Sequence, residues 1–346
     1  IDRPGDQDFF RIEGRAGEDV VAEVYARRLD SPLDSVLRLT DAAGKELAVN
    51  DDWEDKGYGL GTHHADSYLR ATLPADGVYY FRLSDTQNKG GADYGYRLRI
   101  SAPRPDFELR VTPSSLNARA GLSVPFTVFA LRRDGFSNEI SVTLKEAPPG
   151  FRLSGGRIAA GQDQARMTLT AGATEAGEPV GIELEGRAKV CGREIVHRAV
   201  PAEDMMQAFA YRHLVPVKQL AVAVTGRGGF RAPKVMGESP VKIVPGGTAL
   251  VRIEGPGYLD RFRFELIDAP QGITIREVKS IGSGAEILLG SDAGKAKPGL
   301  QGNLIVNLVP IPGRGGAGKS PPVQRRVAAG TLPAIAFEIV APRTEP

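Results

Sequence analysis

Short runs of alternating apolar and polar residues cover the first part of the chain. The clearest runs are residues 10–12, 20–25, 36–39, 78–83 and 96–100. A period of two places successive side chains on opposite faces of an extended strand, so each run predicts a strand with one buried face. Turn-forming residues separate the runs, and no segment with helical periodicity interrupts them. The pattern is typical of an antiparallel sandwich or barrel.

A second strand-rich block follows the proline-containing linker at residues 102–105. Its strand-like runs fit an immunoglobulin-like (Ig-like) sandwich without the Cys…Trp…Cys signature. A third block repeats one unit of the second, in which a strand leads to an Ala-Pro-x-Gly turn and another strand. The turn begins at Ala147 in one copy and at Ala269 in the other. Two copies of this unit predict two sandwiches of the same kind.

Residues 201–214 depart from the strand pattern. Pro201 suits the first position of a helix, Glu203 suits its positive N-terminal end, and Arg212 suits the opposite end. The residues that would form one buried face are Met205, Met206, Phe209 and Leu214. We predict a short helix that connects two sandwiches, and a partner-binding helix is the alternative.

The predicted fold class is all-β, with tandem β-sandwiches and one short connecting helix. The predicted domains are a first sandwich at 1–103, an Ig-like sandwich at 106–200, the helix at 201–214 and a second Ig-like sandwich at 215–346. A chain of 346 residues can bury a core in each of three such domains. Its 42 glycines and 25 prolines supply turns between short strands.

Composition excludes several functional classes. With 44 basic and 42 acidic residues the net charge is +2, which gives no electrostatic case for binding nucleic acid. The single cysteine, Cys191, cannot form an intrachain disulfide. No apolar run approaches the roughly 20 residues that a transmembrane helix needs. No signal peptide is visible, and we interpret the abrupt opening at Ile1 as a point inside a longer protein.

Residues 313–320 match the phosphate-binding P-loop pattern. That site needs a helix directly after the loop, with its N-terminus facing the phosphates. Pro321 and Pro322 follow instead, and the second proline has no backbone amide where a helix would propagate. We therefore predict a glycine-rich hairpin loop and no nucleotide binding.

Oxygen-bearing side chains gather at Asn50, Asp51, Asp52 and Asp55. Calcium takes ligands of this type, although the spacing and central glycine of an EF-hand loop are missing. The sequence therefore predicts an irregular calcium site as the candidate metal site. The alternative is that these side chains cap turns through hydrogen bonds to their own backbone.

Two aromatic residues accompany the acidic loop, namely Trp53 and Tyr58. Exposed aromatic rings on a sandwich loop can stack on sugars or contact a protein partner, so both are candidate ligand-binding residues. A partly buried loop anchor is the alternative.

Other candidate chemistry is sparse. His63, His64 and Asp66 could contribute to a transition-metal site only if a loop brings both imidazoles together. Cys191 and His197 are too far apart along one strand for a nucleophile–base pair, and no Gly-x-Ser-x-Gly element exists. We therefore expect no catalytic residues and no enzyme.

The first block also contains short elements in a distinctive order. They are Gly5-Asp6-Gln7-Asp8-Phe9-Phe10, Ser31-Pro32-Leu33-Asp34, Asn50-Asp51-Asp52, Asp66-Ser67-Tyr68-Leu69, Pro74-Ala75-Asp76-Gly77-Val78-Tyr79-Tyr80 and Asp93-Tyr94-Gly95-Tyr96. Through these elements residues 1–102 resemble the bacterial pre-peptidase C-terminal domain family. The resemblance implies a jelly-roll-like sandwich appended to secreted hydrolases and large surface proteins. Relatives in that family associate with collagen or polysaccharide, some with calcium, and their usual first strand is largely missing here.

The expected function is that of non-catalytic binding or spacer modules in a larger secreted, periplasmic or cell-surface bacterial protein. Its partners would be other domains of the parent protein and a polysaccharide or extracellular protein. The alternative is a carbohydrate- or protein-recognising module that uses the loop from Asn50 to Tyr58, and a hydrolase site between domains is a third. No cofactor other than calcium is expected.

Overall fold

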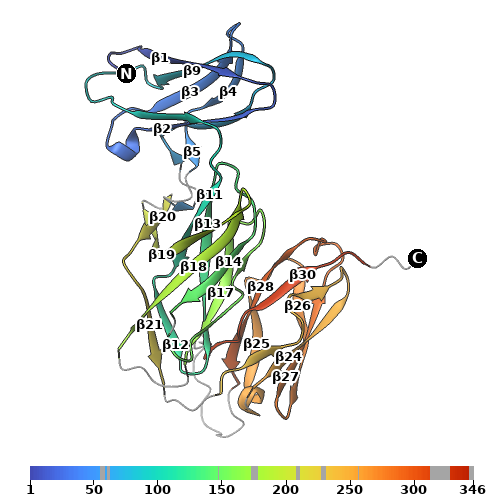
Figure 1. Cartoon of the computed structure of the whole chain (residues 1–346). Helices are drawn as coiled ribbons and strands as arrows, with labels where there is room; N and C mark the ends of the chain where they lie inside the picture. Colours follow the sequence, from blue (N-terminus) through green and yellow to red (C-terminus); the bar gives the residue numbers. More distant parts are fainter. Residues whose placement is uncertain are drawn as a thin grey trace. The chain divides into compact units, whose positions relative to one another are not determined.

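The computed structural model describes residues 1–54, 59–60, 63–146, 148–172, 178–207, 211–226, 231–255, 257–311 and 328–342. Its regular structure there consists of strands apart from two short 3-10 turns, η1 (Arg27–Leu29) and η2 (Gly257–Arg261). The all-β prediction is confirmed (Figure 1). The chain divides into two compact units, the first made of residues 1–107, 131–136 and 204–215 and the second of the remainder.

The first unit contains a sandwich of two antiparallel sheets (Figure 1). One sheet has the order β1 (Gln7–Gly14), β9 (Gly77–Asp85), β3 (Ser35–Asp41) and β4 (Glu46–Asn50), and the other has the order β10 (Arg97–Ser101), β2 (Asp19–Tyr25) and β8 (Tyr68–Thr72). Period-two alternation fixes which side chains face inward, so Phe81 and Leu83 of β9 are fully buried whereas Arg82 between them faces outward. Inward residues from both sheets, including Leu37 and Leu39, form one core.

Three very short strands complete the description of this unit. They are β5 (Trp53–Glu54), β6 (Gly59–Leu60) and β7 (His63–His64). β5 pairs with β7, and β6 pairs with β20 (Tyr211–Pro216). The acidic loop after β4 therefore leads directly into paired strands.

The second unit contains the strands of the predicted second and third sandwiches, apart from the ends of β11, β13 and β19 that belong to the first unit. Those of the second block are β11 (Asp106–Thr112), β12 (Ser115–Arg119), β13 (Ser123–Arg133), β14 (Ile140–Lys145), β15 (Arg152–Ser154), β16 (Arg157–Ile158), β17 (Gln164–Thr170), β18 (Val180–Val190), β19 (Arg193–Gln207) and β21 (Leu220–Thr225). Those of the third are β22 (Lys234–Met236), β23 (Val241–Ile243), β24 (Thr248–Glu254), β25 (Phe262–Ile267), β26 (Ile273–Ile281), β27 (Gly284–Ser291), β28 (Gln301–Pro310), β29 (Gly330–Thr331) and β30 (Ile335–Ile339).

The two blocks of the second unit are joined by specific contacts. Leu122 belongs to the buried core of the third block, and the neighbouring Ser123 pairs with Thr331 of β29. The backbone N–H of Ala334 donates to Oγ1 of Thr168 over 2.7 Å. The repeated strand–turn–strand pattern thus lies within one compact unit, and the predicted boundaries of three separate domains stay a prediction. Ala147 of the first repeated turn lies outside the described residues.

The predicted helix at 201–214 is wrong. Residues up to Gln207 extend β19, and β20 begins at Tyr211. β19 pairs with β18 on one side and in parallel with β11, where Pro201 lies opposite Val111. Met205 and Met206 are exposed, so they form no buried face. Pairing with β11, a strand distant in sequence, continues the extended backbone of β19 into this segment. That pairing outweighs the local helical signals, which contribute only tenths of a kcal/mol per residue.

Candidate functional site

The start of the acidic loop is held to the sheet by Asn50. Its Oδ1 accepts a hydrogen bond from the backbone N–H of Tyr68 at 2.8 Å, and its Nδ2 donates to the backbone oxygen of Asp52 at 2.8 Å. Oδ1 of Asp51 accepts from the N–H of Asp52 at 3.0 Å. The two local contacts, within residues 50–52, are of the turn-capping kind that the sequence left as the alternative to metal ligation.

The calcium prediction remains untested by this arrangement. Asp55 lies outside the described residues. Within the part of the chain that the structure describes, no group of three or more His, Cys, Asp or Glu side chains is placed to hold a metal ion. Asn50, Asp51 and Asp52 are adjacent in sequence, but the single side-chain oxygen of Asn50 accepts from Tyr68 of β8, and one oxygen of Asp51 accepts from Asp52.

Trp53 lies both against the sandwich and in contact with solvent. It is 42% exposed, and its ring centroid lies 4.3 Å from that of Tyr68 with an interplanar angle of 38°. In β5 it pairs with His64 of β7. The ring therefore packs on Tyr68 and keeps a solvent-exposed part that a ligand could contact. Tyr58, its predicted companion, lies outside the described residues.

Beneath this aromatic pair lies a buried polar group that the sequence did not reveal. The hydroxyl of Tyr68 donates to Asp134 Oδ1 at 2.9 Å. Asp134 also accepts from Nη1 and Nη2 of Arg99 at 2.8 and 3.0 Å, and from the backbone N–H of Arg104 at 2.7 Å. Burial and the Asp134 carboxylate together raise the pKa of Tyr68. Tyr68 is thus a fixed, neutral support for Trp53.

A second buried group surrounds Asp66. The carboxylate accepts from the N–H groups of Ala26, Arg27 and Arg28 at 3.0, 2.7 and 3.3 Å and from Nε of Arg28 at 2.8 Å. The same guanidinium donates from Nη1 to Glu23 at 3.0 Å and lies 4.0 Å from the ring centroid of Tyr25. Asp66 therefore fixes the turn at η1. This occupies the carboxylate that the sequence considered beside His63 and His64.

Acid is expected to destabilise the first unit through Asp66 and Asp134. Burial alone would raise the pKa of each carboxyl, but hydrogen bonds from Arg28 to Asp66 and from Arg99 to Asp134, among others, hold both pKa values below the ordinary Asp value. A depressed folded pKa gives stabilisation that is complete above the unfolded pKa of about 4 and is lost as pH falls through the folded value.

The melting temperature followed by circular dichroism should therefore change little down to about pH 5 and fall below about pH 4. An Asp66→Asn variant should have a lower melting temperature at neutral pH. Its melting temperature should also fall less in acid than that of the native chain, because one of the two titrating groups is gone. A native melting temperature that stays constant to about pH 2 would contradict this expectation.

Two further sequence features were considered for chemistry, the Cys191–His197 pair and the P-loop match. Cys191 is exposed in the turn between β18 and β19, with a φ of 47°, whereas His197 lies within β19 opposite Gly186. The strand thus carries His197 away from the thiol. The P-loop match at 313–320 lies outside the described residues.

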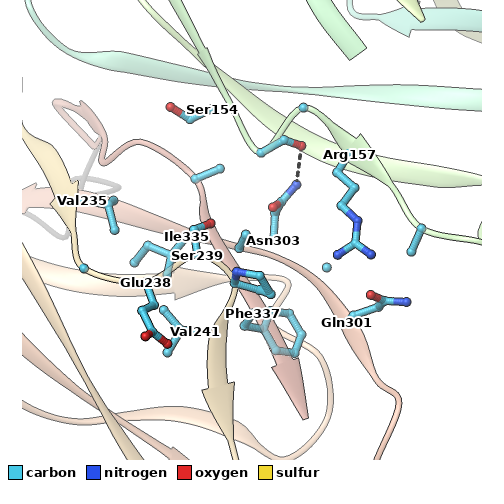
Figure 2. A pocket seen from close by; sticks show the side chains of 18 of the residues that line it. Ser154, Arg157, Val235, Glu238, Ser239, Val241, Gln301, Asn303, Ile335 and Phe337 are labelled. Carbon is cyan, nitrogen blue, oxygen red and sulfur yellow. Dashed lines mark hydrogen bonds between the residues drawn. The ribbon is translucent and has the colours of Figure 1, made fainter. Parts of the chain in front are cut away.

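A cleft of about 400 Å³ lies in the second unit (Figure 2). Asn303 on its wall donates both amide hydrogens, to the backbone oxygens of Gly155 and Arg166, each at 2.8 Å. Gln162 donates to the backbone oxygen of Gln301 at 3.0 Å. These side chains are engaged in joining strands of two blocks, so the cleft is a packing feature rather than the leading site.

Comparisons with known proteins find sequence similarity over only part of the chain. No family model matches the chain. A segment of 83 residues is 42% identical to a probable subtilase-type serine protease of Deinococcus radiodurans and covers 24% of this chain and 10% of that protein. A marsupial T cell receptor chain matches with 11% identity and a TM-score of 0.20 over 59% of this chain and 94% of its own length. The chain therefore shares a small segment with a protein described as a probable subtilase-type serine protease.

Among the described residues no helix has the length and apolar character needed to cross a bilayer.

Proposed function

We propose that this chain is a non-catalytic part of a larger secreted or cell-envelope protein, in which its sandwiches bind a ligand or act as spacers. The observation that carries the proposal is the size of the shared segment. It makes up only 10% of the subtilase-type protein, yet 83 residues is close to the span of the first sandwich, whose strands run from Gln7 to Ser101. A segment of that kind is typical of an appended module rather than of a catalytic domain.

The first sandwich supports the same proposal. Its elements resemble the pre-peptidase C-terminal domain family, whose members accompany secreted hydrolases, and its fold is the two-sheet sandwich that the resemblance implies. The remaining strands are proposed to form Ig-like modules. Apolar contact between the two blocks, such as that of Leu122 in the core of the third block, suits a rigid spacer.

The proposal is tested by searching for catalysis directly. The purified chain is incubated with a fluorophosphonate probe for activated serines and with a fluorogenic peptide mixture, with a commercial subtilisin as the positive control. We expect no labelling and no turnover above buffer. Stoichiometric labelling of one serine, or turnover that survives repurification, would overturn the proposal.

A second candidate function follows from Trp53, which combines exposure with a fixed orientation on Tyr68. A preorganised aromatic ring binds a sugar ring or a partner side chain at a low entropic cost. The loop would then be a carbohydrate- or protein-recognising site. Calcium bound through Asn50, Asp51, Asp52 and Asp55 would order the same loop.

Replacing Trp53 by Ala is expected to weaken such binding at least tenfold, since a central aromatic contributes on the order of 2 kcal/mol or more. The melting temperature should change little, because the ring is 42% exposed and its packing on Tyr68 covers only part of it. A glycan array selects the ligand, and calorimetry then compares the native chain, Trp53→Ala and the control Leu250→Ala, which removes an exposed apolar side chain of the second unit. Equal affinities for all three chains would exclude the loop as the site.

A further inference from the structure

The outward face of the sheet β1-β9-β3-β4 carries residues that folding does not require. The register places Phe9, Arg82, Arg38 and Val49 in one row across all four strands. These positions alternate with core residues and so point away from the sandwich interior. The two arginines lie on β9 and β3, the two central strands of the sheet (Figure 1).

The arginine pair is energetically unfavourable in the folded chain. Arg38 and Arg82 are directly opposite each other, and like charges at such positions destabilise a sheet. Arg38 is compensated by Glu46, with Nη1 and the carboxylate 2.6 Å apart. Arg82 has no ion pair among the described residues, and its Nε is buried without a hydrogen-bond partner. A buried Nε without a partner beside a like charge costs stability, which indicates a role outside folding.

Apolar groups flank this unpaired guanidinium. Phe9 is 61% exposed and Val49 is 47% exposed, at the two ends of the row. Tyr80, in the next row of β9, lies half-buried between Arg11 and Thr40. The exposed ring of Phe9 offers a surface on which a sugar ring can pack. The guanidinium of Arg82, which has no ion pair among the described residues, offers a charge for an anion.

We propose that this face binds a carboxylate-bearing polysaccharide, a chain of uronic acid residues. The guanidinium of Arg82, next to Arg38, receives a sugar carboxylate through charge-assisted hydrogen bonds, and the sugar ring packs against Phe9. A peptide that adds to a sheet uses the main-chain groups of an edge strand. Here the two arginines lie on central strands, whose main-chain groups are already paired with neighbouring strands. A ligand can therefore contact only side chains on this face, and this favours a glycan over a peptide.

This site is separate from the Trp53 loop and does not depend on whether the chain is catalytic. Calorimetry compares tetragalacturonic acid with its methyl ester, which keeps the sugar rings but removes the charges. We expect the acid to bind and the ester to bind at least tenfold more weakly, because hydrogen bonds to charged groups carry the larger part of the affinity. Binding of the acid should weaken as salt is added.

Two variants separate recognition from folding. Arg82→Gln should weaken binding of the acid at least tenfold while the melting temperature stays level or rises, because the like-charge pair is removed. Phe9→Ala should weaken binding of the acid and of the ester alike. The matched control is Arg252→Gln, an arginine on a sheet face of the second unit that is already paired with Glu286; it should bind like the native chain.

The proposal is overturned if Arg82→Gln binds tetragalacturonic acid as tightly as the native chain does. It is also overturned if acid and ester bind equally, or if hexaglutamate binds more tightly than the uronate and displaces it, since the face would then recognise an acidic peptide. Loss of binding together with a lowered melting temperature in Arg82→Gln would also count against it, because that result assigns Arg82 a structural role.

Discussion

Replacing Asp134 by Ala is expected to lower the free energy of unfolding of the first unit by about 3–5 kcal/mol, as for other buried ion pairs that lose one partner. The carboxylate is 4% exposed and accepts hydrogen bonds from Arg99, Tyr68 and the N–H of Arg104. Its removal leaves the Tyr68 hydroxyl and an amide without an acceptor. Arg99 keeps its contact with Glu23 at 2.9 Å, and this limits the loss.

The measurement is urea unfolding followed by tryptophan fluorescence, since Trp53 packs on Tyr68 and reports on this region. Asp134→Asn is the matched variant, because Asn tolerates the left-handed backbone of this position, where φ is 47°, and keeps one acceptor oxygen. It should recover part of the lost stability. If Asp134→Ala and the native chain unfold at the same urea concentration, the buried group does not stabilise the unit.

Replacing Asp66 by Ala is expected to cost a similar amount, about 3–5 kcal/mol. The side chain is fully buried, and its two oxygens are the acceptors for three consecutive N–H groups and for Arg28. Unsatisfied buried donors cost about 1–3 kcal/mol each, although some of these amides would find water after the change. The turn at η1 should then lose its fixed conformation.

Thermal unfolding and hydrogen exchange at residues 26–28 check this prediction. The control is Asp76→Ala, because Asp76 is exposed and accepts one hydrogen bond, from the N–H of Ala16 at 2.8 Å. It should shift the melting temperature far less than Asp66→Ala does. Comparable shifts for both variants, or unchanged exchange at residues 26–28, would contradict the role assigned to Asp66.

The strands of the first sandwich were predictable because each depends on a pattern within a few residues. The run 78–83 alternates strictly, and β9 buries Phe81 and Leu83 as that alternation requires. The capping role of Asn50 was also foreseen as an alternative, since Asn and Asp side chains bond to nearby backbone. Its partner Tyr68 was not foreseen, because the contact joins residues far apart in the chain.

The helix predicted at residues 201–214 was wrong because contacts between residues far apart in the chain decided the structure there. Proline, acidic and basic residues there are arranged as in a helix, but such preferences are small beside the pairing of β19 with β11, which reaches Pro201. For Arg82 the local pattern was right, but it was not sufficient. Its outward position follows from alternation, whereas its lack of a partner depends on which side chains the neighbouring strands place beside it.

The sequence by itself determined the all-β class, the inward and outward sides of the strands, and the scarcity of catalytic motifs, because these depend on periodicity and residue type. Only the tertiary structure decided that Asp134 meets Arg99 and Tyr68, that Asp66 closes a turn, and that Arg82 stands beside Arg38. These side-chain contacts depend on strand order and register across many residues, so they cannot be predicted from the pattern of a single strand.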